Sequence, residues 1–365
     1  MIFLGIETSC DETALSLLET REEKGVFEYR ILANIVHSQI ELHKEYGGVF
    51  PILAKREHIK NLPLLYTQIL KDAQIDEKEI DAIAVTEGPG LEPALWTGIV
   101  FAKELGERLS LPLIPVNHME GHIVSALFTK TTIEKEFSQL KAVAFPALAL
   151  LISGGHTEII HIAQAATYKV LGRTRDDAIG EAFDKVARML GFAYPGGPEI
   201  SRYAALAREE NLPHTITLPR PMIHSKDLDF SFSGLKTSVL YTVRELGTLT
   251  ETHKKEIARE FEDAVTEVLI TKVKQALEDN ECQSLIVGGG VIANTHIRKA
   301  FETLATEASI PLYLPGAGLT GDNALMIVLA GALPFTQAHT QSHTHNAKGP
   351  TDIKARGNLS LELRD

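Results

Sequence analysis

Two histidines four residues apart, His118 and His122, form the spacing in this sequence that most directly indicates chemistry. On a helix, residues four apart lie on one face, so both imidazoles can offer a nitrogen to one metal ion. A bare pair is more often two ordinary surface or core histidines, so a metal site needs a third ligand. Asp322, just before a predicted helix, can supply it, although an aspartate there also suits a helix N-cap. Two histidines and one carboxylate suit iron or zinc, with positions left open for substrate oxygens.

The pair does not have the geometry of a zinc protease. In that motif the glutamate directly follows the first histidine and acts as general base. Here Glu120 stands two residues after His118, which turns it about 200° around a helix. We therefore disfavour a metalloprotease, and a peptidase assay with and without chelator would test this alternative.

Three apolar stretches of the chain each run into a turn of small residues. Turns containing small residues follow apolar stretches at residues 8–13, 153–157 and 288–290. Such turns expose successive backbone N–H groups, which favour anions and phosphates above all. One such turn alone would indicate only a tight hairpin. Two hairpins followed by a strand-to-helix turn match the two phosphate-binding hairpins and the adenosine-binding turn of the sugar kinase, Hsp70 and actin superfamily.

Asp11 and Glu12 lie in the first of these turns. Carboxylates beside a phosphate-binding turn repel the ligand unless a metal ion or a proton intervenes, so we predict a catalytic role for both rather than simple turn chemistry. Asp184 lies beside the apolar stripe of a predicted helix, where it could accept a hydrogen bond from a substrate hydroxyl or remain a solvated helix residue.

Strands and helices alternate throughout, which predicts an α/β fold. The repeated glycine hairpins predict two similar lobes of the actin-like ATPase type around a nucleotide cleft. We expect the N-terminal lobe at residues 1–125, completed by a helix at about 322–335, and the C-terminal lobe at 126–321. Residues 336–365 are rich in Thr, His, Gln and Asn and are predicted to form a polar, partly disordered tail.

Composition restricts the possible partners and location. The chain has 365 residues and a net charge of −12, from 48 acidic and 36 basic side chains, so an RNA partner would need a local basic patch or another subunit. Cys10 and Cys282 are the only cysteines and are far apart, which fits a reducing cytoplasm. The sequence shows no basic leader, and its longest apolar run is well short of the roughly 18 residues of a membrane span. We expect a soluble cytoplasmic protein.

Seven motifs, in order along the chain, resemble the TsaD family of tRNA N6-adenosine threonylcarbamoyltransferases. They are Ile6–Thr13, His118–His122, Ser153–Thr157, Gly180–Lys185, Tyr194–Pro198, Phe230–Thr237 and Gly288–Asn294. The resemblance implies transfer of a threonylcarbamoyl group from threonylcarbamoyl-AMP to N6 of adenosine next to the anticodon, in tRNAs that read ANN codons, with release of AMP. Retention of both phosphate hairpins leaves a small-molecule or carbamoyl kinase of the same superfamily as the alternative.

The resemblance also implies site residues and cofactors. The metal ligands map onto His118, His122 and Asp322, and the metal is expected to be Fe²⁺, with Zn²⁺ as the alternative. The nucleotide ligand is threonylcarbamoyl-AMP, AMP or ATP. The implied substrate contacts are Leu151, Ile152, Ser153, Gly154, Gly155, Asp184, Gly197 and Asn294.

Two positions, Leu151 and Ser201, differ from the archaeal pattern and favour a bacterial type, while Asn117 departs from many bacterial members. Archaeal members have a tyrosine ligand where this chain has Leu151 and an acidic contact at Ser201, and many bacterial members have a further histidine at Asn117. The implied partners are tRNA, a TsaB-like paralogue that docks on the N-terminal lobe and a TsaE-like ATPase. A TsaC/Sua-type synthase supplies the donor, and no membrane is involved.

Overall fold

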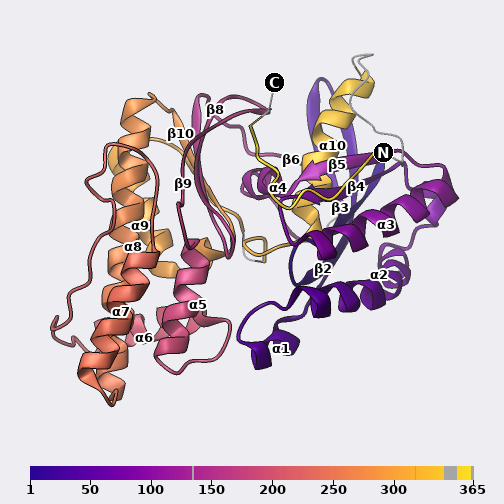
Figure 1. Ribbon diagram of the computed structural model, residues 1–365. Helices are drawn as coiled ribbons and strands as arrows, with labels where there is room; N and C mark the ends of the chain where they lie inside the picture. Colours follow the sequence, from indigo (N-terminus) through magenta and orange to yellow (C-terminus); the bar gives the residue numbers. More distant parts are fainter. Residues whose placement is uncertain (134, 317, 341–351, 363–365) are drawn as a thin grey trace. The chain divides into compact units, whose positions relative to one another are not determined.

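The computed structural model describes residues 1–133, 135–316, 318–340 and 352–362. The chain divides into two compact units, the first formed by Met1–Ala142 with the chain from Pro315 onward, and the second by Val143–Leu314. Figure 1 shows each unit as a sheet with helices packed against it. Within the described ranges, every helix is too short or too polar to cross a bilayer.

The first unit contains a mixed sheet in the order β5-β4-β1-β2-β3-β6. Its strands are β1 (Ile2–Glu7), β2 (Glu12–Glu23), β3 (Val26–Ser38), β4 (Ala82–Gly88), β5 (Leu113–Asn117) and β6 (Ser138–Gln139). Strand β1 pairs antiparallel with β2 and parallel with β4. The segment around the first turn of small residues is therefore the predicted hairpin, and residues 8–11 form its turn.

Helices cover both faces of this sheet (Figure 1). They are α1 (Ile40–His43), η1 (Lys44–Tyr46), α2 (Pro51–Ala73), η2 (Glu77–Glu79), α3 (Glu92–Leu109), α4 (His118–Ser125) and α10 (Ala324–Thr340). Leu4 and Ile6 pack with α2 and α3, whereas Phe3 packs with α4 and α10, as the alternation of side chains along a strand requires. A Cβ at Gly5 would lie 2.6 Å from the Ala324 carbonyl oxygen, so glycine lets α10 lie directly on β1.

The second unit repeats the strand order of the first as β11-β10-β7-β8-β9. Its strands are β7 (Ala147–Ile152), β8 (Thr157–Gln164), β9 (Thr167–Arg173), β10 (Ser284–Gly288) and β11 (Leu312–Tyr313). Its helices are α5 (Ile179–Met189), α6 (Gly196–Glu209), α7 (Ser233–Leu246), α8 (Glu251–Asp279), η3 (Gly290–Ala293) and α9 (Thr295–Ala308). Strand β7 pairs antiparallel with β8 and parallel with β10, which is the pairing of β1 with β2 and β4. This repeat confirms the predicted α/β fold of two similar lobes.

The first unit extends beyond the predicted boundary at residue 125. Strand β6 pairs with β3, and the Tyr29 hydroxyl accepts hydrogen bonds from the backbone N–H groups of Thr129 and Lys130. Phe128 is buried in the core that contains α10. These contacts keep residues 126–142 in the first unit, so the division between the units lies after Ala142.

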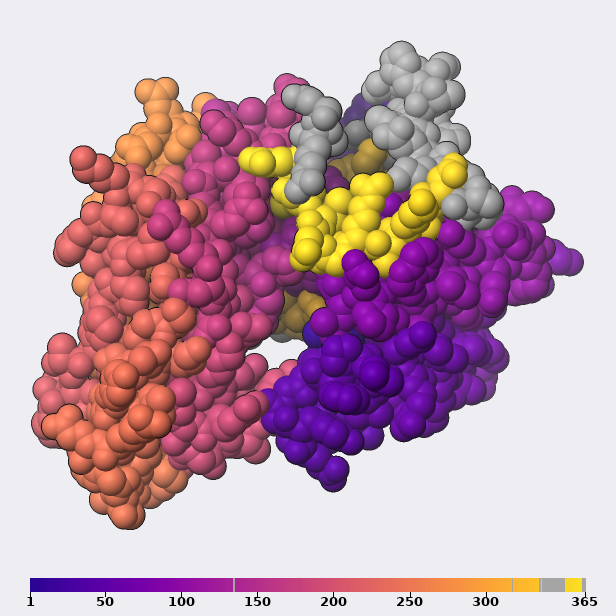
Figure 2. All heavy atoms as spheres, viewed as in Figure 1, coloured from indigo at the N-terminus to yellow at the C-terminus, as the bar shows by residue number. Residues whose placement is uncertain are grey.

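The end of the chain also differs from the predicted polar tail. Helix α10 continues to Thr340, and residues 352–362 pack on the first unit, while 341–351 lie outside the described residues. Ile353 is fully buried among side chains of α2, α3 and the sheet. The backbone N–H of Arg356 donates to the Glu87 carbonyl, and that of Gly90 donates to the Gly357 carbonyl. Figure 2 shows this segment, in yellow, lying on the purple surface of the first unit.

Replacing Ile353 by alanine should lower the free energy of unfolding by about 2–4 kcal/mol, because the change leaves a cavity in a packed core. Ile52→Ala is the matched control, since Ile52 is 70% exposed, and should change stability by less than about 0.5 kcal/mol. Chemical denaturation of both variants measures the difference. Equal stability of the two variants would contradict the packing of this segment.

Candidate metal centre and substrate contacts

Helix α4 begins at His118, directly after strand β5. Asn117 is its N-cap: the side-chain oxygen accepts a hydrogen bond from the Met119 N–H at 2.9 Å, and its Nδ2 donates to the Ser360 carbonyl at 3.1 Å. Asn117 therefore starts the helix and also holds Ser360 against it. The helical spacing places His118 and His122 on one face, with Glu120 turned away from it.

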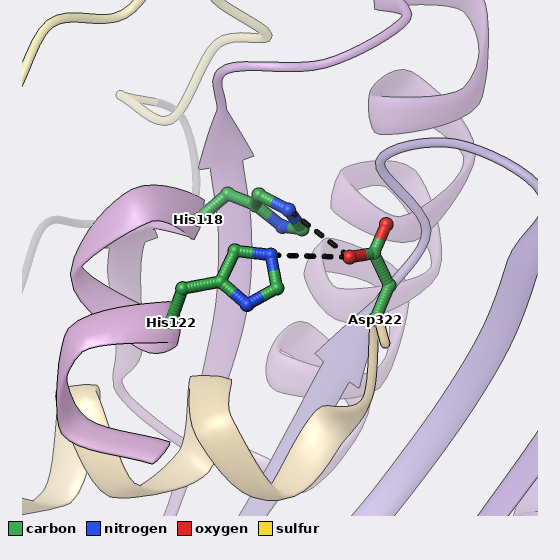
Figure 3. Close-up of side chains that lie close together, drawn as sticks. All are labelled: His118, His122 and Asp322. Atoms are coloured by element: carbon green, nitrogen blue, oxygen red, sulfur yellow. Dashed lines mark ion pairs between the residues drawn. The ribbon is translucent and has the colours of Figure 1, made fainter. Parts of the chain in front are cut away.

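Asp322 lies in the turn before α10 but does not cap that helix. The cap is the next residue, Asn323, whose side-chain oxygen accepts from the Met326 N–H at 3.0 Å. Asp322 Oδ1 instead lies 3.4 Å from His118 Nε2 and 3.2 Å from His122 Nε2. Figure 3 shows both imidazoles extending from α4 toward this carboxylate. The reading of Asp322 as an N-cap is wrong, and the predicted three residues meet within one unit.

Both histidine rings of this cluster are buried, and the ring nitrogens of His122 have no protein hydrogen bond in the described part of the chain. The side chains of His118 and His122 are 6% and 0% exposed, and neither ring nitrogen of His122 has a hydrogen-bond partner among the described residues. One ligand atom from each of the three residues lies within 4.8 Å of the others. Buried nitrogens without partners are costly unless a ligand satisfies them, so the arrangement fits a bound cation.

Charge in the cluster also favours a cation. Burial acts to raise the pKa of Asp322, but both histidines hold it well below the usual range of an aspartate. Burial acts to lower the pKa of His118, yet Asp322 and Glu7 raise it well above its usual value. The buried Glu7 and the partly buried Asp322 therefore require positive charge between them, which either a proton or a divalent metal ion can supply.

The predicted catalytic carboxyls lie at the start of strand β2 in the same unit. Burial, the Asp11 carboxylate and Asp322 raise the pKa of Glu12 to about 9, so Glu12 carries a proton at neutral pH. Asp11 is 6% exposed, and its Oδ2 has no hydrogen-bond partner in the described part of the chain. A neutral carboxyl can donate a hydrogen bond to an anionic ligand, where a second carboxylate would repel it.

The turn that carries Asp11 is held by a buried histidine from α2. Burial lowers the pKa of His58, so its ring is neutral and carries one N–H. His58 Nε2 donates to the Cys10 carbonyl at 3.0 Å, and Nδ1 therefore accepts from the Thr13 hydroxyl at 2.8 Å. The two hydrogen bonds fix both sides of the turn.

The implied substrate contacts lie in the second unit. Leu151 and Ile152 are fully buried in β7, and the turn Ser153–Gly155 follows them, closed by the Ser153 N–H donating to the His156 carbonyl at 2.9 Å. A Cβ added at Gly154 or Gly155 would meet no protein atom within 4 Å. The backbone of this turn is therefore accessible to a ligand.

Comparison with known proteins agrees with this geometry. Residues 30–329 match the family model TsaD, described as tRNA N6-adenosine threonylcarbamoyltransferase. The enzyme of that name from Polynucleobacter asymbioticus is 43% identical over 370 residues, covering 98% of each chain. Another from Thermosipho melanesiensis is 44% identical over 331 residues, covering 91% of this chain and 94% of the relative.

The chain belongs to the TsaD family. Solved structures with the same fold are more distant from this TsaD chain. Component A of (R)-2-hydroxyglutaryl-CoA dehydratase from Acidaminococcus fermentans is 13% identical, with a TM-score of 0.51 over 93% of this chain and 99% of that chain. HypF from T. kodakarensis is 12% identical, with a TM-score of 0.56 over 95% of this chain and 48% of that chain. Both support the actin-like fold class predicted for the TsaD chain.

Two of the substrate contacts implied for this TsaD chain also have structural partners. Asn294 caps α9 by accepting from the Ile297 N–H at 3.0 Å, and its Nδ2 donates to Glu262 at 2.6 Å. Asp184 Oδ1 accepts from the Gly196 N–H at 2.6 Å, which joins α5 to the start of α6. Their contacts with substrate stay predictions, as does that of Gly197, where an added Cβ would meet no neighbour within 4 Å.

The two glycine turns of this TsaD chain should respond differently to alanine. Gly289 has φ +93°, and its Cβ would lie 2.4 Å from the Ile152 carbonyl oxygen, so Gly289→Ala should destabilise the fold by about 1–3 kcal/mol. Gly154→Ala should fold normally but weaken AMP binding about tenfold, or roughly 1.4 kcal/mol. Thermal unfolding and calorimetry separate these effects. Unchanged AMP affinity in Gly154→Ala would make that turn structural only.

Glu7, which is not singled out by residue type and spacing, contacts the candidate metal centre. It ends β1, is fully buried and lies 3.1 Å from His118 Nδ1. Burial acts to raise the pKa of Glu7, but the His118 ring holds it below its usual value. A glutamate inside an otherwise apolar strand, Ile2–Glu7, was the available signal, since a charge there requires a partner.

Proposed function

We propose that this chain transfers the threonylcarbamoyl group from threonylcarbamoyl-AMP to N6 of adenosine next to the anticodon, in tRNAs that read ANN codons, and releases AMP. The observation that carries the proposal is the cluster of two buried histidines, His118 and His122, with Asp322, in a chain that matches TsaD enzymes over nearly its whole length. A sugar-kinase type of reaction has no use for a paired-histidine metal site, so we do not favour the kinase alternative.

We propose that His118, His122 and Asp322 hold one divalent metal ion, most simply Fe²⁺, with Zn²⁺ as the alternative. When bound, such an ion supplies a Lewis acid and a template for the donor's oxygens. Both ring nitrogens of His122 are buried without a hydrogen-bond partner among the described residues, which supports this assignment. Anaerobic purification followed by elemental analysis would identify the ion.

The chain's own residues are proposed to bind the donor and to handle its charge. The turn Ser153–Gly155 would offer backbone N–H groups to the phosphate, and the turn before Asn294 would take the adenosine. The accessible backbone at Gly154 supports the first assignment. Glu12, whose pKa is raised by burial and by the Asp11 carboxylate, would donate a hydrogen bond to the anionic donor, and Asp11 would accept a proton from the attacking amine.

We propose that tRNA binds across a composite surface and that the chain works in the cytoplasm with other subunits. A net charge of −12 gives little general attraction for RNA, which needs clustered basic side chains. A TsaC/Sua-type synthase would supply threonylcarbamoyl-AMP, and a TsaE-like ATPase would join a pair formed with a TsaB-like paralogue.

Exposed apolar side chains on two packed helices support docking of the TsaB-like paralogue on the first unit. Helix α2 packs against α3, and we call their exposed apolar residues the α2–α3 face. They are Ile52, Ile59, Leu64, Trp96 and Val100, which are 70%, 55%, 63%, 39% and 45% exposed. Ile52 and Ile59, seven residues apart, and Trp96 and Val100, four apart, each share one side of their helix, and exposed apolar groups that lie together are typical of an interaction surface.

A pair of substitutions with equal exposure tests this partner. Leu64→Glu should weaken association with the paralogue at least tenfold, whereas Tyr241→Glu, at a residue 62% exposed on α7, should leave it unchanged. Association is measured by calorimetry or by co-elution from a sizing column. Normal association of Leu64→Glu would exclude docking at the α2–α3 face.

Depletion of the protein from cells tests the proposed activity. Nucleosides from total tRNA are separated and quantified by mass spectrometry before and after depletion. Threonylcarbamoyladenosine should disappear from tRNAs that read ANN codons, while other modified nucleosides persist. Its persistence at normal levels after complete depletion would contradict the proposal.

A further inference from the structure

Glu7 is a buried carboxylate whose oxygens are all directed at specific donors. Its Oε1 accepts from the Ser9 N–H, and its Oε2 accepts from the Thr86 hydroxyl at 2.6 Å. Oε2 also lies 3.1 Å from His118 Nδ1. A carboxylate with no exposed surface is costly unless its oxygens are satisfied, and these three contacts account for its position at the end of β1.

His118 has distinct surroundings on its two ring nitrogens. Nδ1 faces Glu7 Oε2 and also the Ser9 hydroxyl, which is 3.2 Å away. Nε2 faces Asp322 Oδ1 at 3.4 Å. A neutral imidazole carries one N–H, and a carboxylate can only accept, so the contact with Glu7 places the proton on Nδ1 and leaves the Nε2 lone pair free.

His122 has no comparable support. Neither of its nitrogens has a hydrogen-bond partner among the described residues, although Nε2 lies 3.2 Å from Asp322. Of the two histidines, His118 alone is oriented by a carboxylate behind it. Histidine ligands are commonly oriented in this way, and loss of the supporting carboxylate typically weakens metal binding 10- to 100-fold.

We propose that Glu7 is a positioning residue that fixes His118 with its proton on Nδ1, so that Nε2 can bind the divalent metal ion. This rests on the metal site proposed above. Through its other oxygen, Glu7 also holds the N–H of Ser9, at the start of the turn that carries Asp11 and Glu12. One buried carboxylate thus sets the position of the metal-binding ring relative to the catalytic turn.

Glu7→Gln tests the proposal without changing the volume of the side chain. An amide has one oxygen and one NH₂ group, so it cannot accept from both Ser9 and His118. With its oxygen on the Ser9 N–H, the NH₂ group faces Nδ1 and forces the ring proton onto Nε2, where it blocks coordination. We expect the dissociation constant for Zn²⁺, measured by competition with a chelating indicator, to rise 10- to 100-fold.

Glu19→Gln is the matched control, because it changes another carboxyl of the β1–β2 hairpin to an amide, and this carboxyl pairs with Arg30 rather than with His118. It should change Zn²⁺ affinity less than about threefold, and circular dichroism verifies folding of each variant. Wild-type affinity in Glu7→Gln, together with weakened binding in His118→Ala, would overturn the role of Glu7 while leaving the metal site intact. Undiminished binding in His118→Ala would overturn the metal site, and the role of Glu7 with it.

A measurement on the wild-type protein gives a second test that needs no variant. In the Zn²⁺-loaded protein with ¹⁵N-labelled histidine, long-range nitrogen–proton correlation distinguishes the two ring nitrogens. We expect His118 to be protonated on Nδ1, with Nε2 bound to the metal. Protonation on Nε2, with Nδ1 bound to the metal, would overturn the proposal even if Glu7→Gln failed to fold.

Discussion

Replacing both His118 and His122 by alanine should remove the bound metal ion and lower the transfer rate at least about 10³-fold, or roughly 4 kcal/mol in activation free energy. The reason is that two of the three candidate ligand side chains are lost at once, and Asp322 alone leaves one oxygen. The fold should persist, because both residues belong to a short helix whose N-cap, Asn117, is unchanged. Elemental analysis and thermal unfolding measure the two outcomes.

His214→Ala is the control for this double variant, because His214 is an exposed histidine of the second unit. It should retain full metal content and full activity. Asp322→Ala should behave like the double variant, although with a smaller loss of metal affinity. Full metal occupancy in His118→Ala/His122→Ala would show that the ion binds elsewhere.

Glu12→Gln should stabilise the protein while lowering the transfer rate about 10²-fold. The pKa of Glu12 is about 9 in the folded protein, against 4.5 as its ordinary value. Between these two pH values the folded protein holds a proton that the unfolded chain has released, so stability falls as pH rises. The amide removes this dependence, and at pH 8 the variant should be more stable by about 1–3 kcal/mol.

The stability difference between wild type and Glu12→Gln should therefore be close to zero below pH 4.5, grow as the pH rises, and level off above pH 9. Denaturant unfolding at a series of pH values measures it. Glu45→Gln is the control, because Glu45 is exposed on η1, and it should show no such trend. A pH-independent difference for Glu12→Gln would contradict a raised pKa.

The parts of the fold that depend on local chemistry could be predicted from the sequence. Turns of small residues after apolar strands predicted the hairpins β1–β2 and β7–β8, and helical spacing predicted that His118 and His122 share a face. The third ligand, Asp322, came from a resemblance together with residue type. Asp322 is available to the histidines because the next residue, Asn323, caps the helix instead. The sequence does not show which of these two adjacent residues is the cap.

Contacts between distant parts of the chain could not be predicted. Ile353 lies in a polar stretch, so its burial depends on docking against α2 and α3 rather than on any local pattern. The side-chain amide of Asn294 donates a hydrogen bond to Glu262, which lies on another helix, α8. Glu7 gains its role only because β1 brings it beside α4, where it meets His118.

Transfer in a purified system tests the central claim most directly. The protein, loaded with Fe²⁺ and supplied with its paralogue and ATPase partners, is incubated with synthetic threonylcarbamoyl-AMP and an unmodified tRNA transcript that reads an ANN codon. Mass spectrometry of the digested tRNA should show threonylcarbamoyladenosine next to the anticodon, formed together with AMP, and none with His118→Ala/His122→Ala. Absence of the product with the wild-type protein, or its full formation by the double variant, would contradict the account.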